Sequence, residues 1–134
     1  PNGTITRIDP ADDHVVWTAK LHPWLDAPVV AGGYVWVGTN SDPALFKFDL
    51  ATGDQLKSIP TGSPDSRIAV GDGALWLENS RRGTITRVDL ATDRTRSFPV
   101  GHAPAGLLVV GHRLWVGLTP SPDDELKAIA WLGL

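Results

Sequence analysis

Apolar and polar residues follow one another in short segments along the whole chain, and this pattern predicts β-strands. The segments are four to seven residues long, are rich in Val, Ile, Leu, Trp and Thr, and end at Gly-Gly, Asp-Gly, Gly-His or Ala-Thr-Gly-Asp turns. Around Trp76 both faces of the predicted strand are apolar, because Leu75 and Leu77 point one way and Ala74 and Trp76 the other. A sheet built from such strands has to be covered on both faces.

The pattern repeats with a period of about 40 residues. The phrases GTITRIDPADD, ALFKFDLATGD and GTITRVDLATD are equivalent and place Asp9, Asp49 and Asp89 at intervals of 40 and 40. A fixed period of this length is typical of repeat folds. A second set of phrases, GGYVWVGT, GALWLEN and HRLWVGL, repeats in step and contains Trp36, Trp76 and Trp115.

Each period contains four predicted strands: a short apolar strand, the Trp strand, the Asp-ended strand and an outer strand. Tight hairpins that need positive φ join the first two. Stacked four-stranded antiparallel sheets of about 40 residues are β-propeller blades, whereas an immunoglobulin-like sandwich gives no reason for the period. We therefore predict an all-β fold, a β-propeller segment of about three blades. The divisions are 1–25 (last two strands of a blade), 26–62 (a blade), 63–101 (a blade) and 102–134 (first three strands of a blade).

In the final blade the third strand is predicted at Glu125–Ala130, with Ala128 opposite Trp115 and Ala130 in the place of Asp89. About three and a quarter blades do not close a ring, since propellers have roughly four to eight blades. Because the chain also starts at Pro1 and contains no methionine, we expect a piece of a six- or seven-bladed propeller. The expected partners are the remaining blades of the same protein or another copy of the fragment.

Two repeated features are expected to be structural. Each repeated Asp precedes a turn, where its carboxylate can accept hydrogen bonds from backbone amides. The hairpin symmetry also predicts that Lys47 lies opposite Trp36 and that Arg87 lies opposite Trp76, which puts a cation beside an indole.

Composition narrows the function classes. Twelve basic and fifteen acidic residues give a net charge of −3, and the arginines alternate with acidic residues, so no nucleic-acid-binding face is expected. The absence of cysteine excludes disulfides and thiolate chemistry but leaves the cellular compartment open. No apolar run is long enough for a membrane span.

The loops that differ between repeats are the predicted binding surface, because such loops gather on one face of a propeller. The alternative for Trp24 is packing over a blade edge. No catalytic residue, cofactor site or metal site is predicted, since histidines do not occur in pairs at ligand spacing and the DDH and DDE phrases are expected to be solvated. The predicted ligand contacts are His22, Trp24, Asp26, Asp65, Arg67 and His102.

Phrases such as RIAVGDGALWLENSRRGTITRVDLATDR and VVAGGYVWVGT resemble bacterial β-propeller repeats of the virginiamycin B lyase-like and YVTN types, and also quinoprotein-type repeats. These families include a lyase, cofactor-dependent dehydrogenases and non-catalytic sensor or binding modules. The lyase pattern has a histidine before the inner strand and a glutamate after the Trp. Here Ala105 and Asn79 stand in those places, with His102 and Glu78 out of register. The resemblance therefore implies no proton-abstracting base, and no ligands for a quinone cofactor.

The leading interpretation is a non-enzymatic propeller segment of a larger bacterial protein, whose loops bind a protein, a peptide or a glycan. The alternative is a fragment of a virginiamycin B lyase-like enzyme whose catalytic residues lie on other blades. A purely structural repeat scaffold is the third possibility.

Overall fold

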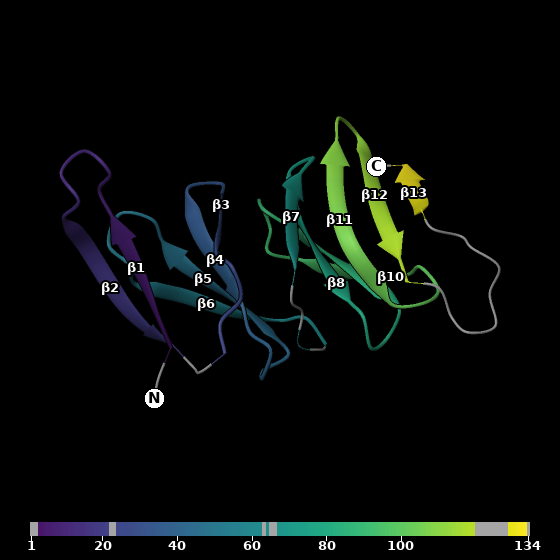
Figure 1. Ribbon diagram of the computed structural model, residues 1–134, viewed down its shortest axis with the longest axis horizontal. Coiled ribbons are helices and arrows are strands. Elements are labelled where there is room, and N and C mark those ends of the chain that lie inside the picture. The colour runs from purple at the N-terminus through teal and green to yellow at the C-terminus, as the bar shows by residue number, and fades with distance from the viewer. Residues whose placement is uncertain (1–2, 22–23, 63, 65–66, 120–128, 134) are drawn as a thin grey trace. The chain divides into compact units, whose positions relative to one another are not determined.

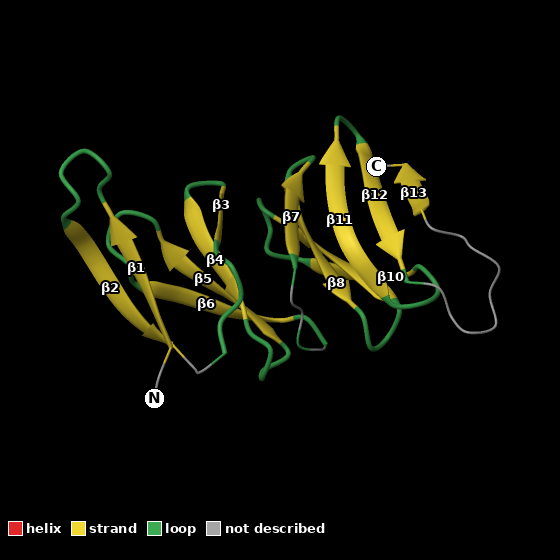
Figure 2. Cartoon of the chain, viewed as in Figure 1, coloured by secondary structure: helices red, strands yellow, loops and turns green. Residues whose placement is uncertain are grey.

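The computed structural model describes residues 3–21, 24–62, 64, 67–119 and 129–133, the last of these as backbone only. This described part contains thirteen strands and no helix, which confirms the all-β class (Figures 1 and 2). Within it there is accordingly no helix that could cross a membrane. The strands are β1 (Gly3–Ile8), β2 (Val15–Leu21), β3 (Val29–Ala31), β4 (Tyr34–Gly38), β5 (Ala44–Asp49), β6 (Gln55–Pro60), β7 (Ile68–Gly71), β8 (Ala74–Asn79), β9 (Thr84–Asp89), β10 (Thr95–Pro99), β11 (Pro104–Val110), β12 (Arg113–Leu118) and β13 (Ile129–Gly133).

Within each sheet, consecutive strands pair antiparallel, and the described strands form four sheets. The orders are β1-β2, β3-β4-β5-β6, β7-β8-β9-β10 and β11-β12-β13. Two sheets therefore hold all four strands of the predicted repeat, one holds its last two and one its first three. This is the arrangement of a partial β-propeller of about three blades.

The inner hairpins form where the sequence predicts them. Asp72 and Gly73 connect β7 to β8 with φ of 53° and 68°, and Gly32 and Gly33 connect β3 to β4 with φ of 60° and 82°. Two consecutive residues with positive φ twist the chain in the sense that the flanking strands require. The equivalent connection between β11 and β12, Gly111-His112, is as short, but only Gly111 has positive φ (57°).

The contacts divide the chain into two compact units, Pro1–Pro64 and Asp65–Leu134. In the first unit, sheet β1-β2 packs against sheet β3-β4-β5-β6. Trp17 of β2 extends this contact: its Nε1 donates to the carbonyl of Leu50 (3.1 Å), and its ring lies so close to Gly53 that an added Cβ would be 2.6 Å from Trp17 Cδ2. The buried core of the unit consists of Ile5, Leu21, Val35, Val37, Phe46 and Phe48.

In the second unit, sheet β7-β8-β9-β10 packs against sheet β11-β12-β13. Trp76 lies in this core and donates from Nε1 to the carbonyl of Gly71 (3.2 Å), the same bond that Trp36 makes to Ala31 (3.0 Å) in the first unit. The repeated Trp is thus a packing residue that anchors the hairpin before it. The buried core of the second unit consists of Ala74, Trp76, Ile85, Leu114 and Val116.

The register predicted for the last strand is wrong. Strand β13 begins at Ile129, and Trp131 pairs with Trp115, while Gly133 pairs with Arg113. Neither Ala128 opposite Trp115 nor Ala130 in the place of Asp89 is therefore observed. The paired run Ile-Ala-Trp-Leu is uncharged, whereas the predicted strand contained Glu125 and Lys127. An uncharged run suits a strand in a sheet with a buried face better than a charged one does.

Candidate functional site

The loop between β2 and β3 carries the most exposed tryptophan among the described residues. Trp24 is 73% exposed, and its φ of 71° places it in the left-handed region, which is unusual for a bulky residue. Backbone contacts hold the loop against the end of β4: the Trp24 carbonyl accepts from the amide of Asn40 (3.1 Å), and Leu25 forms a bridge with Thr39. The indole is thus presented outward by a segment fixed at its base.

Asp26 adds a partly buried carboxylate to this loop. Its amide donates to the carbonyl of Gly38 (3.1 Å), and its Oδ1 accepts from Nδ2 of Asn40 (3.1 Å). Its Oδ2 is buried and has no hydrogen-bond partner. Burial raises the pKa of Asp26, and the bond from Asn40 acts in the opposite direction. A carboxylate in this setting favours a ligand that supplies a donor or a positive charge.

A second loop region, in the other compact unit, is organised by Arg67. The Arg67 guanidinium donates from Nη1 to the carbonyl of Ala105, and its Nε lies 3.6 Å from Oε1 of the buried Glu78. Ser80 Oγ donates to the carbonyl of Pro104 (2.9 Å). The segment that follows the exposed His102 is therefore joined to the preceding sheet by side chains of residues that flank strands β7 and β8.

The six predicted contact residues are thus distributed over two regions. Trp24 and Asp26 share the first loop, while Arg67 contacts the strand that follows His102. His22 and Asp65 lie outside the described residues. The predicted roles of all six as ligand contacts stay predictions.

Two further residues of these loop regions, Asn40 and Glu78, are not among the ligand contacts that the sequence predicts. Asn40 reaches Asp26 from the end of the neighbouring strand, a pairing that no local pattern reveals. Glu78 did leave a signal, because the equivalent positions of the other repeats are Gly38 and Gly117. Asn79, which stands where the lyase pattern has its glutamate, is buried and accepts a hydrogen bond from the amide of Arg82 (3.1 Å), so it closes a hairpin turn.

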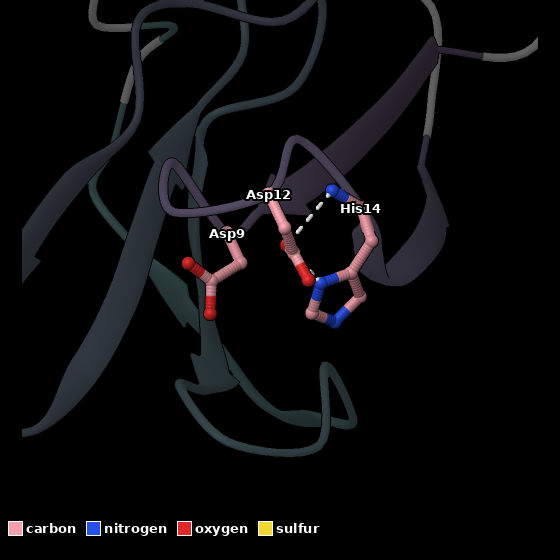
Figure 3. Close-up of side chains that lie close together, drawn as sticks. All are labelled: Asp9, Asp12 and His14. Carbon is pink, nitrogen blue, oxygen red and sulfur yellow. Dashed lines mark hydrogen bonds and ion pairs between the residues drawn. The ribbon is translucent and has the colours of Figure 1, made fainter.

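The turn between β1 and β2 brings two carboxylates and an imidazole together (Figure 3). Potential ligand atoms of Asp9, Asp12 and His14 lie within 4.8 Å of one another, and Asp12 Oδ1 is 2.5 Å from His14 Nδ1. This contact lowers the pKa of Asp12. Asp12 and His14 are exposed, and Asp9 Oδ1 accepts from the amide of Ala11 (2.9 Å). We interpret the group as a turn closed by its own side chains.

The equivalent turns confirm the structural role of the repeated Asp. Asp49 Oδ1 accepts from the amides of Ala51 (2.8 Å) and Thr52 (2.9 Å). Asp89 Oδ1 accepts from the amides of Ala91 and Thr92 in the same way. The carboxylates therefore serve the turns of three separate sheets.

The predicted pairs of cation and indole are also confirmed. Lys47 lies opposite Trp36 in register, with its Nζ 4.8 Å from the indole centroid, and Arg87 lies opposite Trp76, with its Cζ at 5.7 Å. Tyr34 adds a second ring at 4.0 Å from the Lys47 Nζ. These side chains belong to the blades themselves.

Four-stranded antiparallel sheets that repeat every 40 residues, each packed against a neighbouring sheet of its own unit, define a segment of a β-propeller. Solved propellers agree with this class. The chain is similar to hydrazine synthase of Kuenenia stuttgartiensis, with a TM-score of 0.80 and 15% identity over 97% of this chain and 40% of that one. It is similar to dihydro-heme d1 dehydrogenase NirN, with a TM-score of 0.68 and 16% identity over 98% of this chain and 33% of that one.

A third similar structure is the N-terminal domain of Nup159, with a TM-score of 0.63 and 19% identity over 90% of this chain and 34% of that one. The chain thus spans between 33% and 40% of the length of these three structures. No family model and no curated protein matches the sequence. At these identities the similarity establishes the propeller fold, and the function has to be argued from the residues.

Proposed function

We propose that the chain is a non-catalytic propeller module that binds a protein, peptide or glycan ligand through its variable loops. The observation that carries the proposal is the outward presentation of Trp24 by a loop fixed at its base. A large aromatic side chain that is ordered before binding loses little conformational freedom when a ligand covers it. Exposed aromatic side chains of this kind are common anchors of binding surfaces.

Comparison with the repeated tryptophans supports this assignment. Trp36 and Trp76 are buried and donate their Nε1 protons to backbone carbonyls of their own hairpins. Trp24 lies outside the repeat and is largely exposed. Packing therefore explains Trp36 and Trp76 but does not explain Trp24.

Polar groups beside the same loop would give the surface specificity. Asp26 and Asn40 form a hydrogen-bonded pair at the base of the loop, and Asn40 is exposed. An amide and a carboxylate near an aromatic face can orient hydroxyl or amide groups of a ligand. Arg67 and His102 extend the proposal to the second loop region as further polar contacts.

Wild-type protein and the Trp24→Ala variant, applied to arrays of immobilised oligosaccharides and short peptides, test this function. We expect at least one class of immobilised ligand to be bound, and Trp24→Ala to weaken that binding about tenfold or more, since truncation of an aromatic anchor commonly costs that much. Leu56→Ala is the matched control, because Leu56 is an exposed apolar side chain of the same unit. Circular dichroism checks that both variants fold.

The proposal is wrong if neither array retains the wild-type protein. It is also wrong if every bound ligand has the same affinity for wild type and for Trp24→Ala.

A further inference from the structure

Sheet β11-β12-β13 presents an apolar face that the described residues leave uncovered. Leu108, Val110 and Trp115 are 58%, 57% and 39% exposed, and Leu108 pairs directly with Trp115. The alternate residues of the same strands, such as Leu114 and Val116, are fully buried in the core of the unit. One face of this sheet is thus packed, and the other, which carries Arg113 beside the apolar Leu108, Val110 and Trp115, is exposed.

The equivalent face of the preceding sheet shows what such a face is built to contact. Trp76 occupies the position of Trp115 one repeat earlier, is only 3% exposed, and packs in a cluster with Leu114 and Val116 of the next sheet. The approach is close, because a Cβ added at Gly71 would lie 2.4 Å from Cγ1 of Val109. We call the face of a sheet that carries the repeated Trp its Trp face. In this unit, therefore, the Trp face of sheet β7-β8-β9-β10 packs against the face of the following sheet that carries Leu114 and Val116.

The first unit follows the same rule. Ile5 of β1 stands where Ile85 stands in β9, and it packs with Val35 and Phe48 of the following sheet. The opposite face of sheet β1-β2 has no cover from the described residues of its own unit. That outer face carries Thr4, Thr6, Ile8, Thr18 and Lys20.

The outer face of β1-β2 is equivalent to a face that is buried elsewhere in the chain. Thr6 and Thr18 share a hydrogen bond between their hydroxyls (3.1 Å), as Thr86 and Ser97 do one unit later (3.0 Å). Thr6 and Ile8 stand where Phe46 and Phe48 stand one repeat later, and Phe46 and Phe48 pack in a cluster with Ile5 inside the first unit. The Trp face of sheet β11-β12-β13 and the outer face of sheet β1-β2 are both exposed. They are equivalent to the two faces that pack against each other inside a unit.

We propose that the exposed Trp face of β11-β12-β13, made of Leu108, Val110 and Trp115, is a docking surface for a second copy of this chain, which binds through the outer face of its β1-β2 sheet. The two faces differ, so the contact is head-to-tail, and such contacts close into rings or extend into filaments. The described residues of each copy form four sheets, so two copies supply eight, which is within the range of about four to eight propeller blades. We expect a closed pair.

The exposed Trp face contains a hollow that can accept side chains of a packed sheet. A shallow hollow of about 400 Å³ lies on this sheet, lined by Leu108, Trp115, Gly106 and Gly117 together with neighbouring aliphatic residues. The space beside Gly106 is open, since no atom lies within 4 Å of the position of an added Cβ. A side chain of a packed sheet can occupy this hollow, and burial of Leu108, Val110 and Trp115 would stabilise the contact through the hydrophobic effect.

Sedimentation over a wide range of protein concentration tests the proposal on the 134-residue chain. The wild-type protein should form a species with the mass of two copies. Leu108→Asp should weaken association at least about tenfold, because it places a charge in the centre of the contact. Leu56→Asp is the matched control, because Leu56 is comparably exposed and its equivalent, Arg96, is exposed too. A wild-type protein that stays monomeric at every concentration would overturn the proposal.

A complementation experiment tests the head-to-tail geometry. Leu108→Asp blocks the Trp face but leaves the β1-β2 face intact, and Thr6→Arg does the reverse. Each variant alone should be monomeric, and a mixture of the two should give a complex with one copy of each. If Thr6→Arg alone still pairs, or if the mixture stays monomeric, the proposed contact is wrong. Circular dichroism confirms that both variants, which carry changes only at exposed positions, are folded.

Discussion

At the scale of single residues, the repeated aspartates stabilise the turns that end the third strands. The backbone amides of Thr52 and Ala51 hold the pKa of Asp49 below its ordinary value of 3.8, and the hydroxyl and amide of Thr92 do the same for the pKa of Asp89. These hydrogen bonds favour the charged form of each of the two carboxyl groups. The turns should therefore be weakened by acid.

The direction of this pH effect follows from the lowered pKa values. A carboxyl whose pKa is lower in the folded protein than in the unfolded chain stabilises the fold above its ordinary pKa, and that contribution is lost as the pH falls through the folded pKa. We expect the double variant Asp49→Asn, Asp89→Asn to be less stable than wild type at neutral pH. This difference should shrink as the pH falls below 3.8.

Urea unfolding between neutral and acidic pH measures this difference. Asn keeps an oxygen that can accept the turn hydrogen bonds, so the variant removes the titrating charge together with the ion pair of Asp89 with Arg87 (3.2 Å). Asp13→Asn, at an exposed turn position, is the control for the loss of one surface carboxyl group. A difference that stays constant or grows in acid would contradict the assignment.

At the scale of elements, Gly83 allows the turn between β8 and β9 to approach the segment between β10 and β11. It precedes β9 with φ of 63°, its carbonyl accepts from the amide of Val100 (2.9 Å), and a Cβ added to it would lie 1.8 Å from the carbonyl oxygen of Gly101. Gly73 has a similar φ of 68° but open space beside it. Substituting Ala at Gly73 and at Gly83 therefore separates the cost of backbone strain from the cost of a steric conflict.

Gly83→Ala should therefore destabilise the protein more than Gly73→Ala. We expect a loss of about 1–2 kcal/mol in the free energy of unfolding for Gly73→Ala, which introduces only the left-handed strain. The conflict with Gly101 should raise the loss for Gly83→Ala to about 2–4 kcal/mol. Denaturant unfolding of both variants measures the difference, and equal losses would show that the connection near Gly101 moves freely aside.

The elements themselves were largely predictable from the sequence. Alternation of apolar residues and the turn phrases located both complete meanders, and hairpin symmetry placed Lys47 opposite Trp36. These features depend on residues within a single hairpin, where the spacing of side chains along paired strands is regular. The last strand was placed wrongly because the third strand has no Asp-turn phrase in that repeat to fix its register.

At the scale of the whole molecule, a head-to-tail contact makes stability depend on concentration. Association that requires folded sheets stabilises the folded state by mass action. The midpoint of thermal unfolding of the wild-type protein should therefore rise with protein concentration. The midpoint of Leu108→Asp should stay constant, while Leu56→Asp should behave as wild type; calorimetry at several concentrations measures all three. A constant midpoint for the wild type would contradict the contact.

The sequence by itself determined the repeat, the four-stranded meander and the roles of its recurrent Asp and Trp residues, because alternation and turn chemistry act over a few neighbouring positions. Only the tertiary structure decided how the loops are built. Two contacts join residues from different elements: the hydrogen bond from Asn40 to Asp26 and the bond from Arg67 to Ala105. Glu78 is buried by residues from outside its own strand. Burial and hydrogen bonding at such positions depend on what the rest of the chain brings next to them, which no local pattern specifies.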